Sequence, residues 1–404
     1  MPQGTGVTSD GLRAGTPQLR RALAALFAVG LAAFALLWSP QPLLVLVDAE
    51  FGVGAGRAGL LLSVSTAAIA LAVLPLARLS ERLGRGRVIV GGLAGAVLAG
   101  FAVAGATTWP LLLAARTVQG AALAGVLAAA LAWVAEEVHP TAVTRVGGLY
   151  IAGTTVGGMS GRLLAGFVAD LWGWRAGLLA VVVLAALLTT AAHVLLPASR
   201  RADGARSVPA TEAEGGRGAR VRLYVVAALG MAMFVGVYNV IGYRTSLPPY
   251  LLGTGVASMF FLTYLAGTLT AALAGRLLAR AGLRGGVLTG LAVCAVGVTM
   301  TLAGPLALVW LGLLVVSGGF FVSHAIASSA APQLASRPSA ASGRYTLAYY
   351  LGSSAGAVML GQAWEAGAWG GTVVAALALL GTAALAAAGL PRRAPGGAAE
   401  RVAG

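Results

Sequence analysis

Apolar residues along this chain gather in long runs instead of alternating with polar ones. Each run is close to the roughly 20 residues that an α-helix needs to cross the hydrocarbon of a bilayer, and short polar turns separate the runs. The pattern predicts an all-α membrane protein with twelve transmembrane helices. We expect them at 20–47, 58–78, 88–106, 109–135, 145–169, 176–196, 223–252, 257–278, 286–303, 305–329, 343–364 and 368–389.

Two segments recur half a chain apart. RVGGLYIAGTTVG at 145–157 returns as RYTLAYYLGSSAG at 344–356, with a Gly pair at i and i+4 aligned in both copies. At almost the same offset, ARLSERLGR from Ala77 returns as GRLLARAGL from Gly275. Such a Gly pair leaves one helix face bare, so that another helix can approach closely. Two matches in one register predict two pseudo-symmetric six-helix bundles, as in many secondary transporters.

A change of composition marks the boundary between the two bundles. From Pro197 to Arg222, charged residues, Gly and Pro replace the apolar ones, which predicts a flexible linker. Residues 1–18 are polar and Gly-rich, and we expect a free tail there and not a signal peptide. The expected organisation is an N-terminal tail at 1–18, bundles at 19–196 and 223–390, a linker at 197–222 and a C-terminal tail at 391–404.

Composition supports a lipid environment. Of 404 residues, 58% are hydrophobic and 10% charged, and the mean hydropathy is +0.88. A soluble fold of this size cannot bury that much apolar surface. The net charge of +15 comes from arginine, and most of the 27 basic residues lie at helix ends or loops of one side. This asymmetry follows the positive-inside rule, so we expect no nucleic-acid partner and place linker and both termini in the cytosol.

The turn after the second run resembles the signature loop of the major facilitator superfamily. Here Glu81 stands where the family has Asp, while Arg82, Gly84 and Arg85 match. The resemblance implies a latch on the cytosolic face, and a carboxylate beside arginines at a helix end can form one through charged hydrogen bonds. The second copy has Ala279 in place of the acid.

Further segments resemble one branch of this superfamily, the YnfM-like efflux permeases. They are WSPQPLL from Trp38, YIAGTTVGGMSGRLLAG from Tyr150 and YNVIGYR from Tyr238, with Arg116, Gln119 and Gly120 resembling the fourth-helix motif of the superfamily. The resemblance implies the major facilitator fold, alternating access, efflux by antiport, and a multi-pass protein of the bacterial cytoplasmic (inner) membrane. It says little about the substrate.

Three arginines fall inside apolar runs, where charge is costly and marks a functional site by default. They are Arg116, Arg162 and Arg244. One interpretation is that they line a cavity and attract an anionic or carbonyl-rich substrate. The other is structural: each binds helix carbonyls or an acid such as Asp48, Glu50 or Asp170, or extends to the membrane surface.

No run carries Asp or Glu near its middle, so a proton would need another carrier. The candidates are His324 in the tenth run and, as a weaker one, His193. The residues expected to bind substrate are Gln41, Arg116, Gln119, Tyr150, Arg162, Asn239, Tyr243, Arg244 and Tyr349. Tyr264 and Tyr350 could face the same cavity.

These features predict a secondary active transporter that carries out proton-linked efflux of a small organic compound, with an anion as one candidate. The alternative is an uptake carrier or exchanger for organic anions, which needs no proton carrier. An enzyme is not expected, because HExxH, clustered metal ligands and a Ser-His-acid set are all missing at membrane depth. We expect no metal and no cofactor, a small-molecule substrate, the lipid bilayer and protons as partners, and a monomer.

Overall fold

The computed structural model describes residues 11–197 and 216–392, and within them it is built from helices. The first half contains α1 (Pro17–Trp38), η1 (Gln41–Leu43), α2 (Leu44–Phe51), α3 (Ala55–Ala58), α4 (Leu60–Leu83), α5 (Arg85–Ala104), α6 (Trp109–Glu137) and α7 (Pro140–Leu195). The second half contains α8 (Arg217–Ser246), α9 (Thr254–Ser258), η3 (Met259–Thr263), α10 (Tyr264–Ala271), α11 (Ala274–Met300), α12 (Leu306–Gln333) and α13 (Pro338–Ala388). The predicted all-α membrane fold is confirmed.

Ten helical segments of the described residues are long and apolar enough to cross a membrane. Two of them, α7 with 56 residues and α13 with 51, are far longer than one crossing requires. Each contains a turn with non-helical backbone angles, at Gly173 in α7 and at Gly367–Ala368 in α13. The count of twelve stays a prediction, which follows if α7 and α13 are each divided at these turns.

The boundaries differ from the expected ones in two places. α8 begins at Arg217, so residues 217–222 of the expected linker are helical, while 198–215 lie outside the described residues. Of the expected N-terminal tail, residues 1–10 also lie outside them, but Leu12 pairs with the loop between α6 and α7. Its N–H donates to the carbonyl of Glu137 at 2.8 Å, and its own carbonyl accepts from the N–H of His139 at 3.1 Å. This segment is therefore tied down and not free.

The repeated Gly pairs sit where helices pack most closely. A Cβ at Gly153 or Gly157 of α7 would overlap backbone atoms of Phe27 and Leu31 in α1. In the second half, a Cβ at Gly352 or Gly356 of α13 would overlap the backbone of α8 in the same way. Each half is thus centred on one pair of closely packed helices, as the repeat predicts.

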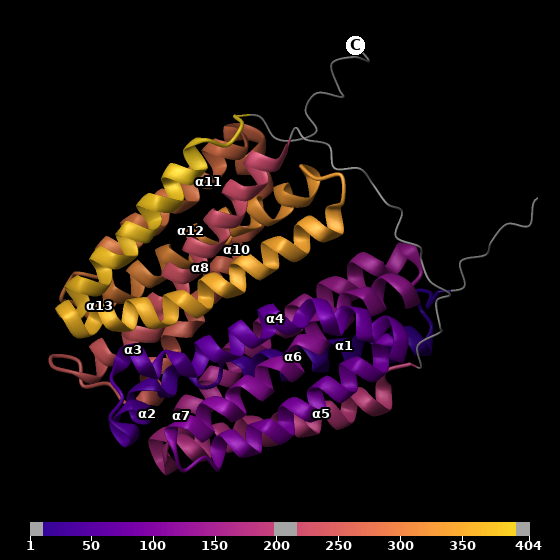
Figure 1. Ribbon diagram of the computed structural model, residues 1–404, viewed down its shortest axis with the longest axis horizontal. Coiled ribbons are helices and arrows are strands. Elements are labelled where there is room, and N and C mark those ends of the chain that lie inside the picture. Colours follow the sequence, from indigo (N-terminus) through magenta and orange to yellow (C-terminus); the bar gives the residue numbers. More distant parts are fainter. Residues whose placement is uncertain (1–10, 198–215, 393–404) are drawn as a thin grey trace, which may run out of the picture.

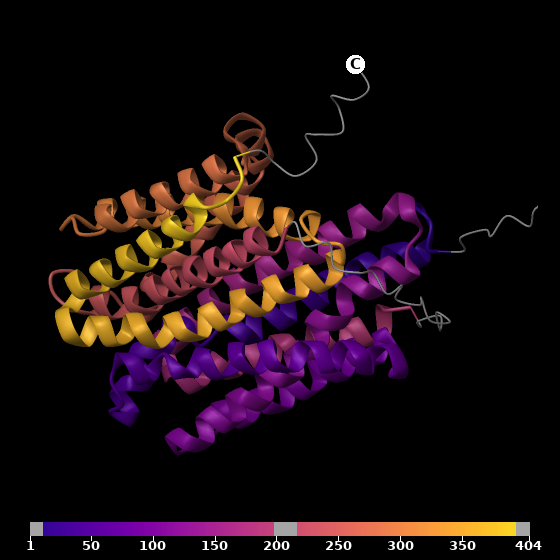
Figure 2. The same cartoon turned by 45° about the horizontal axis from the view of Figure 1, so that its top comes forward.

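The two halves form two separate bundles, and they meet mainly at one end (Figures 1 and 2). We call this the closed end; α2, α3, α9 and the turns of α7 and α13 lie there. The opposite end, where α1 and α8 begin, is called the terminal end. Figure 1 shows the ribbons of the halves close together at the closed end and diverging towards the terminal end.

Candidate functional site

A chain of three buried polar side chains crosses the interface between the halves. Arg162 of α7 donates from Nε to Oε1 of Gln41 at 2.7 Å. Gln41, in η1, donates from Nε2 to Oδ1 of Asn239 in α8 at 2.6 Å. None of the three is more than 3% exposed. The sequence suggested all three as substrate ligands, and the structure brings them together.

Proline chemistry places Gln41 in this chain. α1 ends at Trp38 because Pro40 has no N–H to continue the helical hydrogen bonds. Gln41 and Pro42 then form the single turn η1, which is buried. A continuous helix would place position 41 on another azimuth, so the break at Pro40 directs the amide towards the second half.

The charge of Arg162 is surrounded by aromatic rings. Its guanidinium carbon lies 4.8 Å from the ring centroid of Trp38, 4.6 Å from that of Phe261 and 5.0 Å from that of Tyr264. Its Nη1 donates to the carbonyl of Gly158, one turn back on α7, at 2.7 Å. No carboxylate forms an ion pair with Arg162 among the residues that the structure describes. Ring faces attract a cation but do not neutralise it.

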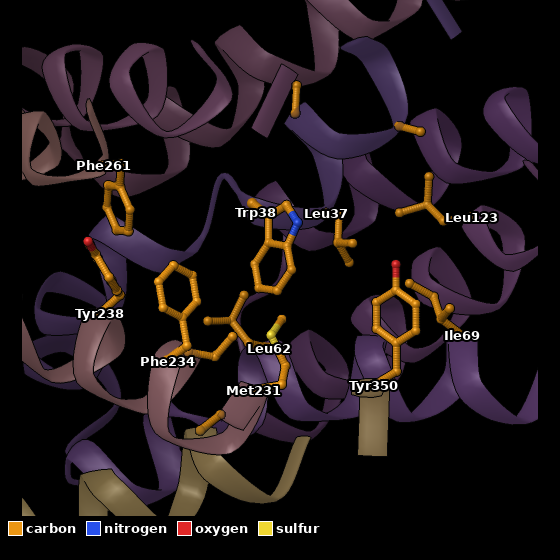
Figure 3. Packing of buried hydrophobic residues seen from close by; sticks show 14 of the residues in the cluster. Leu37, Trp38, Leu62, Ile69, Leu123, Met231, Phe234, Tyr238, Phe261 and Tyr350 are labelled. Carbon is orange, nitrogen blue, oxygen red and sulfur yellow. The ribbon is translucent and has the colours of Figure 1, made fainter. Parts of the chain in front are cut away.

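The second half supplies an aromatic cluster beside this charge. Its members are Phe234, Tyr238, Phe261, Tyr264, Phe320 and Phe321. Phe234 stacks on Phe320 with ring centroids 4.1 Å apart, and Tyr238 meets Tyr264 edge-on at 4.8 Å. Figure 3 shows Phe234 of this cluster facing Trp38 of the first half. Apart from Tyr264, the sequence reasoning missed these residues, because aromatic residues at helical spacing look like ordinary core.

His324 borders the aromatic cluster on α12. Its ring stacks on Phe320 at 5.7 Å and lies 4.8 Å from the ring of Tyr349. Its Nδ1 is 3.0 Å from the hydroxyl of Tyr345. His324 also lines a small pocket with Phe320, Tyr345 and Cys294. The histidine is therefore connected to the site through side chains, and Tyr349 lies in the same group.

Arg116 is satisfied entirely within the first half. Its Nε donates to the carbonyl of Leu61 at 3.0 Å, and Nη1 and Nη2 donate to those of Leu36 and Leu37 at 3.3 and 3.0 Å. Nη1 also donates to Oε1 of Gln119. The carbonyls of Leu36 and Leu37 are near the end of α1, where helical partners are missing because of Pro40. This geometry supports the structural interpretation for Arg116 and for Gln119.

Arg244 binds the end of a helix in the second half. Its Nη1 donates to the carbonyl of Thr301, and Nη2 donates to the carbonyl of Ala303 at 2.8 Å and to the hydroxyl of Tyr250 at 3.2 Å. These carbonyls follow the last turn of α11, where the helix dipole is negative. The ring of Trp369 lies 5.0 Å from the guanidinium carbon. Here too the structural interpretation fits the contacts.

Two contacts between the halves join the segment that follows α1 to α8. Gln41 and Asn239 stand 198 positions apart. Tyr243, whose hydroxyl donates to the carbonyl of Leu44 at 3.2 Å, stands 199 positions from that residue. Both contacts therefore hold the segment that follows α1 against α8 of the other half. The remaining candidate, Tyr150, is buried on α7, with its backbone carbonyl next to Gly30 of α1 and its side chain within electrostatic range of Tyr350 in the second half.

The residues predicted to gate the protein lie at the terminal end and contact the first half. Glu81 is 63% exposed and is 3.5 Å from Arg85, which also pairs with Glu136 of α6 at 2.9 Å. Gly84 has a φ of 94° and forms the turn between α4 and α5. Arg82 is exposed in the last turn of α4. In this conformation Arg85 therefore joins α4, α5 and α6.

Two acids missed as site residues bridge the halves at the closed end. Asp170 of α7 accepts through Oδ2 from the N–H of Gly255 in α9 at 2.8 Å. Glu365 of α13 accepts through Oε1 from the N–H of Gly56 in α3 at 2.9 Å. We call this pair the closed-end carboxylates. Both acids lie at the same end of corresponding helices in the two halves, and this repetition was the signal available in the sequence.

Comparison with known proteins gives consistent results. A profile of the Major Facilitator Superfamily matches residues 23–357. The chain is 35% identical over 367 residues to the inner membrane transport protein YnfM of Escherichia coli, covering 89% of this chain and 88% of that protein. It is 31% identical to the uncharacterized MFS-type transporter YybF of Bacillus subtilis, with 90% and 91% covered. The crystal structure of a bacterial homologue of the human lysosomal transporter Spinster, inward-facing and occupied, is similar in fold, with a TM-score of 0.78, 16% identity, and 93% and 96% covered.

Proposed function

Because the chain belongs to the major facilitator superfamily, we propose that this transporter exports a small organic compound in exchange for protons by alternating access. One observation carries the proposal: the buried chain Arg162–Gln41–Asn239 joins two halves that otherwise diverge towards the terminal end. A substrate bound at this chain touches both halves, so its binding energy can favour one arrangement of the halves over another.

His324 is the proposed proton carrier. Its Nδ1 already has a hydroxyl partner in Tyr345, and its ring borders the aromatic cluster next to Arg162. A histidine can gain and lose a proton in the physiological range. Protonation would place a second positive charge near Arg162, which would change the affinity of the site for a charged substrate.

The test is transport by purified protein in liposomes with an imposed pH gradient, against a panel of anionic and cationic compounds. We expect substrate movement that is driven by the gradient in the wild type and is lost in His324→Gln. Transport that ignores the gradient in both proteins would contradict proton coupling. His193→Gln serves as the control, because His193 is exposed near the end of α7.

An uptake carrier or exchanger for organic anions is the second candidate. The absence of a carboxylate partner for Arg162 among the described residues favours it, because such a site binds an anion without any need for a proton. Counterflow measurements distinguish the two. If the protein is an exchanger, uptake of labelled anion is faster into liposomes that are preloaded with unlabelled anion. The acceleration should be the same in the wild type and in His324→Gln.

The proposed orientation places the terminal end on the cytosolic side of the inner membrane, because most arginines lie at that end. A cysteine at Gly218, in the first turn of α8, should then resist membrane-impermeant thiol reagents in intact cells, and one at Ala49 in α2 should react, because both positions are exposed. Cys294 is replaced by Ser beforehand. Labelling at Gly218 from outside would reverse the orientation.

Glu81 and Arg85 are proposed to latch the two halves when the terminal end closes. Their present contacts lie within the first half, and the exposed carboxylate of Glu81 is free to meet the second half in the other state. If this is right, Glu81→Ala increases labelling of a cysteine placed at Thr268, which is exposed one turn from Tyr264 on α10, and unchanged labelling would contradict the latch.

A further inference from the structure

Two hydrogen-bond donors of the interface chain are open. Arg162 donates from Nε and Nη1, but its Nη2 makes no hydrogen bond to the residues that the structure describes. Nδ2 of Asn239 is buried and likewise has no partner there. Buried polar groups are ordinarily satisfied, so the open donor of Asn239 calls for a missing acceptor, and Nη2 of Arg162 is available to share it. The donors come from opposite halves and belong to one hydrogen-bonded chain.

The orientation of the Asn239 amide follows from its neighbours. Arg162 can only donate, so the oxygen of the Gln41 amide must face Arg162. The NH₂ of Gln41 then faces Asn239, which must accept with its own oxygen. Turning the Asn239 amide around would bring two NH₂ groups together. Nδ2 of Asn239 therefore points away from Gln41 as a free donor.

Charge makes an anion the fitting acceptor. Arg162 is 2% exposed and its nearest polar partners, Gln41 and the carbonyl of Gly158, are neutral. A planar guanidinium offers its donors as a fork that suits the two oxygens of a carboxylate, sulfonate or phosphate. Each of these three acidic groups has at least two oxygens, so it can accept hydrogen bonds from Arg162 and Asn239 at the same time.

The surroundings of the charge determine the rest of the ligand. Next to Arg162, the walls of the site are aromatic, and Tyr264, Phe321 and Tyr349 are half-buried and so retain free surface. Flat rings stack favourably on such faces, whereas a short aliphatic acid covers little of them. His324 closes the same side through its stacking on Phe320.

From these contacts we infer that the substrate is an organic oxyanion with a flat, unsaturated or aromatic body. Its acidic group binds between Nη2 of Arg162 and Nδ2 of Asn239, and its body stacks on the half-buried rings of the second half. This inference rests on the proposed function, since it names the compound class that the proposed transporter moves.

Three matched probes test the two parts of this ligand. 2-Naphthalenesulfonate has the charge and the flat body, 2-naphthalenesulfonamide has the same body without the charge, and hexanesulfonate has the charge without the rings. Dissociation constants are measured by titration calorimetry on the full-length protein in nanodiscs. We expect the first probe to bind at least about tenfold more tightly than either of the others, because each comparator lacks one class of contact.

Variants assign the preference to the two residues. In Arg162→Gln the preference for the sulfonate over the sulfonamide should disappear. Asn239→Asp should also lose sulfonate binding, because its carboxylate becomes an internal competitor for Arg162. Arg162→Lys should keep the preference with weaker binding, since Lys has the charge without the fork. Arg276→Gln is the control, an exposed arginine on α11 away from the site, and should bind like the wild type.

Equal binding of sulfonate and sulfonamide by the wild type would overturn the inference, and so would an unchanged preference in Arg162→Gln. Binding of none of the probes overturns it as well. The same preparations are tested for gradient-driven movement of a cation, ethidium, in liposomes. If ethidium is transported and the probes do not bind, the ligand class is wrong while the transporter proposal stands.

Discussion

Arg116 and Arg162 are both buried at membrane depth without an acidic partner among the described residues, but their surroundings differ. Arg116 gives its donors to three backbone carbonyls and Gln119, all in the first half. Arg162 gives one donor to a carbonyl of its own helix and one to Gln41, which leads across to Asn239. Around Arg116 the helices are fixed to one another, whereas around Arg162 the two halves meet and a donor is left over.

This comparison shows that burial of a charge alone does not mark a site. Two of the three carbonyls that Arg116 binds, those of Leu36 and Leu37, are available because Pro40 ends α1, so the arginine caps a helix end. Arg162 has aromatic faces where Arg116 has carbonyls, and these weaker partners leave it able to exchange them for a substrate. Satisfied donors indicate structure, and open donors at an interface indicate binding.

The largest expected effect is that of Arg116→Ala. It removes the buried side chain that joins α1, α4 and α6 and that binds carbonyls at the end of α1, in a medium that contains no water, and we expect a loss of about 3 kcal/mol or more of folding free energy. The measurement is the yield of monodisperse protein on size-exclusion chromatography and its melting temperature. If Arg116→Ala is as stable as the wild type, Arg116 does not have the structural role that distinguishes it from Arg162.

Arg162→Ala should fold but not transport. Without Arg162, Gln41 keeps its hydrogen bond to Asn239, and the carbonyl of Gly158 stays within helix α7. The substrate, in contrast, loses its counter-charge. We expect a reduction in transport of about 100-fold, the size found when one member of a buried charged pair is removed, with a melting temperature close to that of the wild type. Misfolding of this variant would instead show that Arg162 has a structural role, as Arg116 does.

Arg244→Ala sharpens the comparison with a third arginine. Its contacts resemble those of Arg116, since it binds carbonyls at the end of α11, but it is only half-buried. We expect a loss of about 1–2 kcal/mol in stability, with transport retained in the protein that folds. Thermal unfolding and liposome transport are measured on the same sample, and a folded but inactive variant would identify Arg244 as a ligand instead.

The smallest effects are expected at the closed-end carboxylates. Asp170→Asn and Glu365→Gln keep the shape of each side chain but weaken its hydrogen bond to the other half, each by about 1 kcal/mol. Folding should be unaffected, and the closed end should open several-fold more often. A cysteine at Val45, in a Cys294→Ser background, reports this opening by its labelling rate. Equal labelling rates in the wild type and in the double variant Asp170→Asn/Glu365→Gln would show that the two acids do not hold the closed end together.

Much of the fold could be predicted because lipid demands long apolar runs and because a duplication repeats its Gly pairs. The site was harder to predict. Gln41, Arg162 and Asn239 stand out as polar residues in apolar runs, but whether an intramembrane arginine binds substrate or carbonyls depends on where a break such as Pro40 directs those carbonyls. The aromatic cluster had no distinguishing pattern in sequence, since Phe234 or Phe320 would look the same in any helix core.

The hydrogen bond between Gln41 and Asn239 also bears on the duplication within the chain. An amide carries both a donor and an acceptor, so it can bond to another amide, whereas two arginines or two glutamates cannot pair in this way. Each half supplies one of the two amides from the region of its first long helix, although Gln41 and Asn239 are three positions out of register in the helix contacts of the repeat. Arg162 has no such counterpart, because Gly361 occupies its equivalent position and packs on the backbone of Ala55. The duplicated halves therefore differ at this interface, because only the first half places an arginine beside the pair of amides.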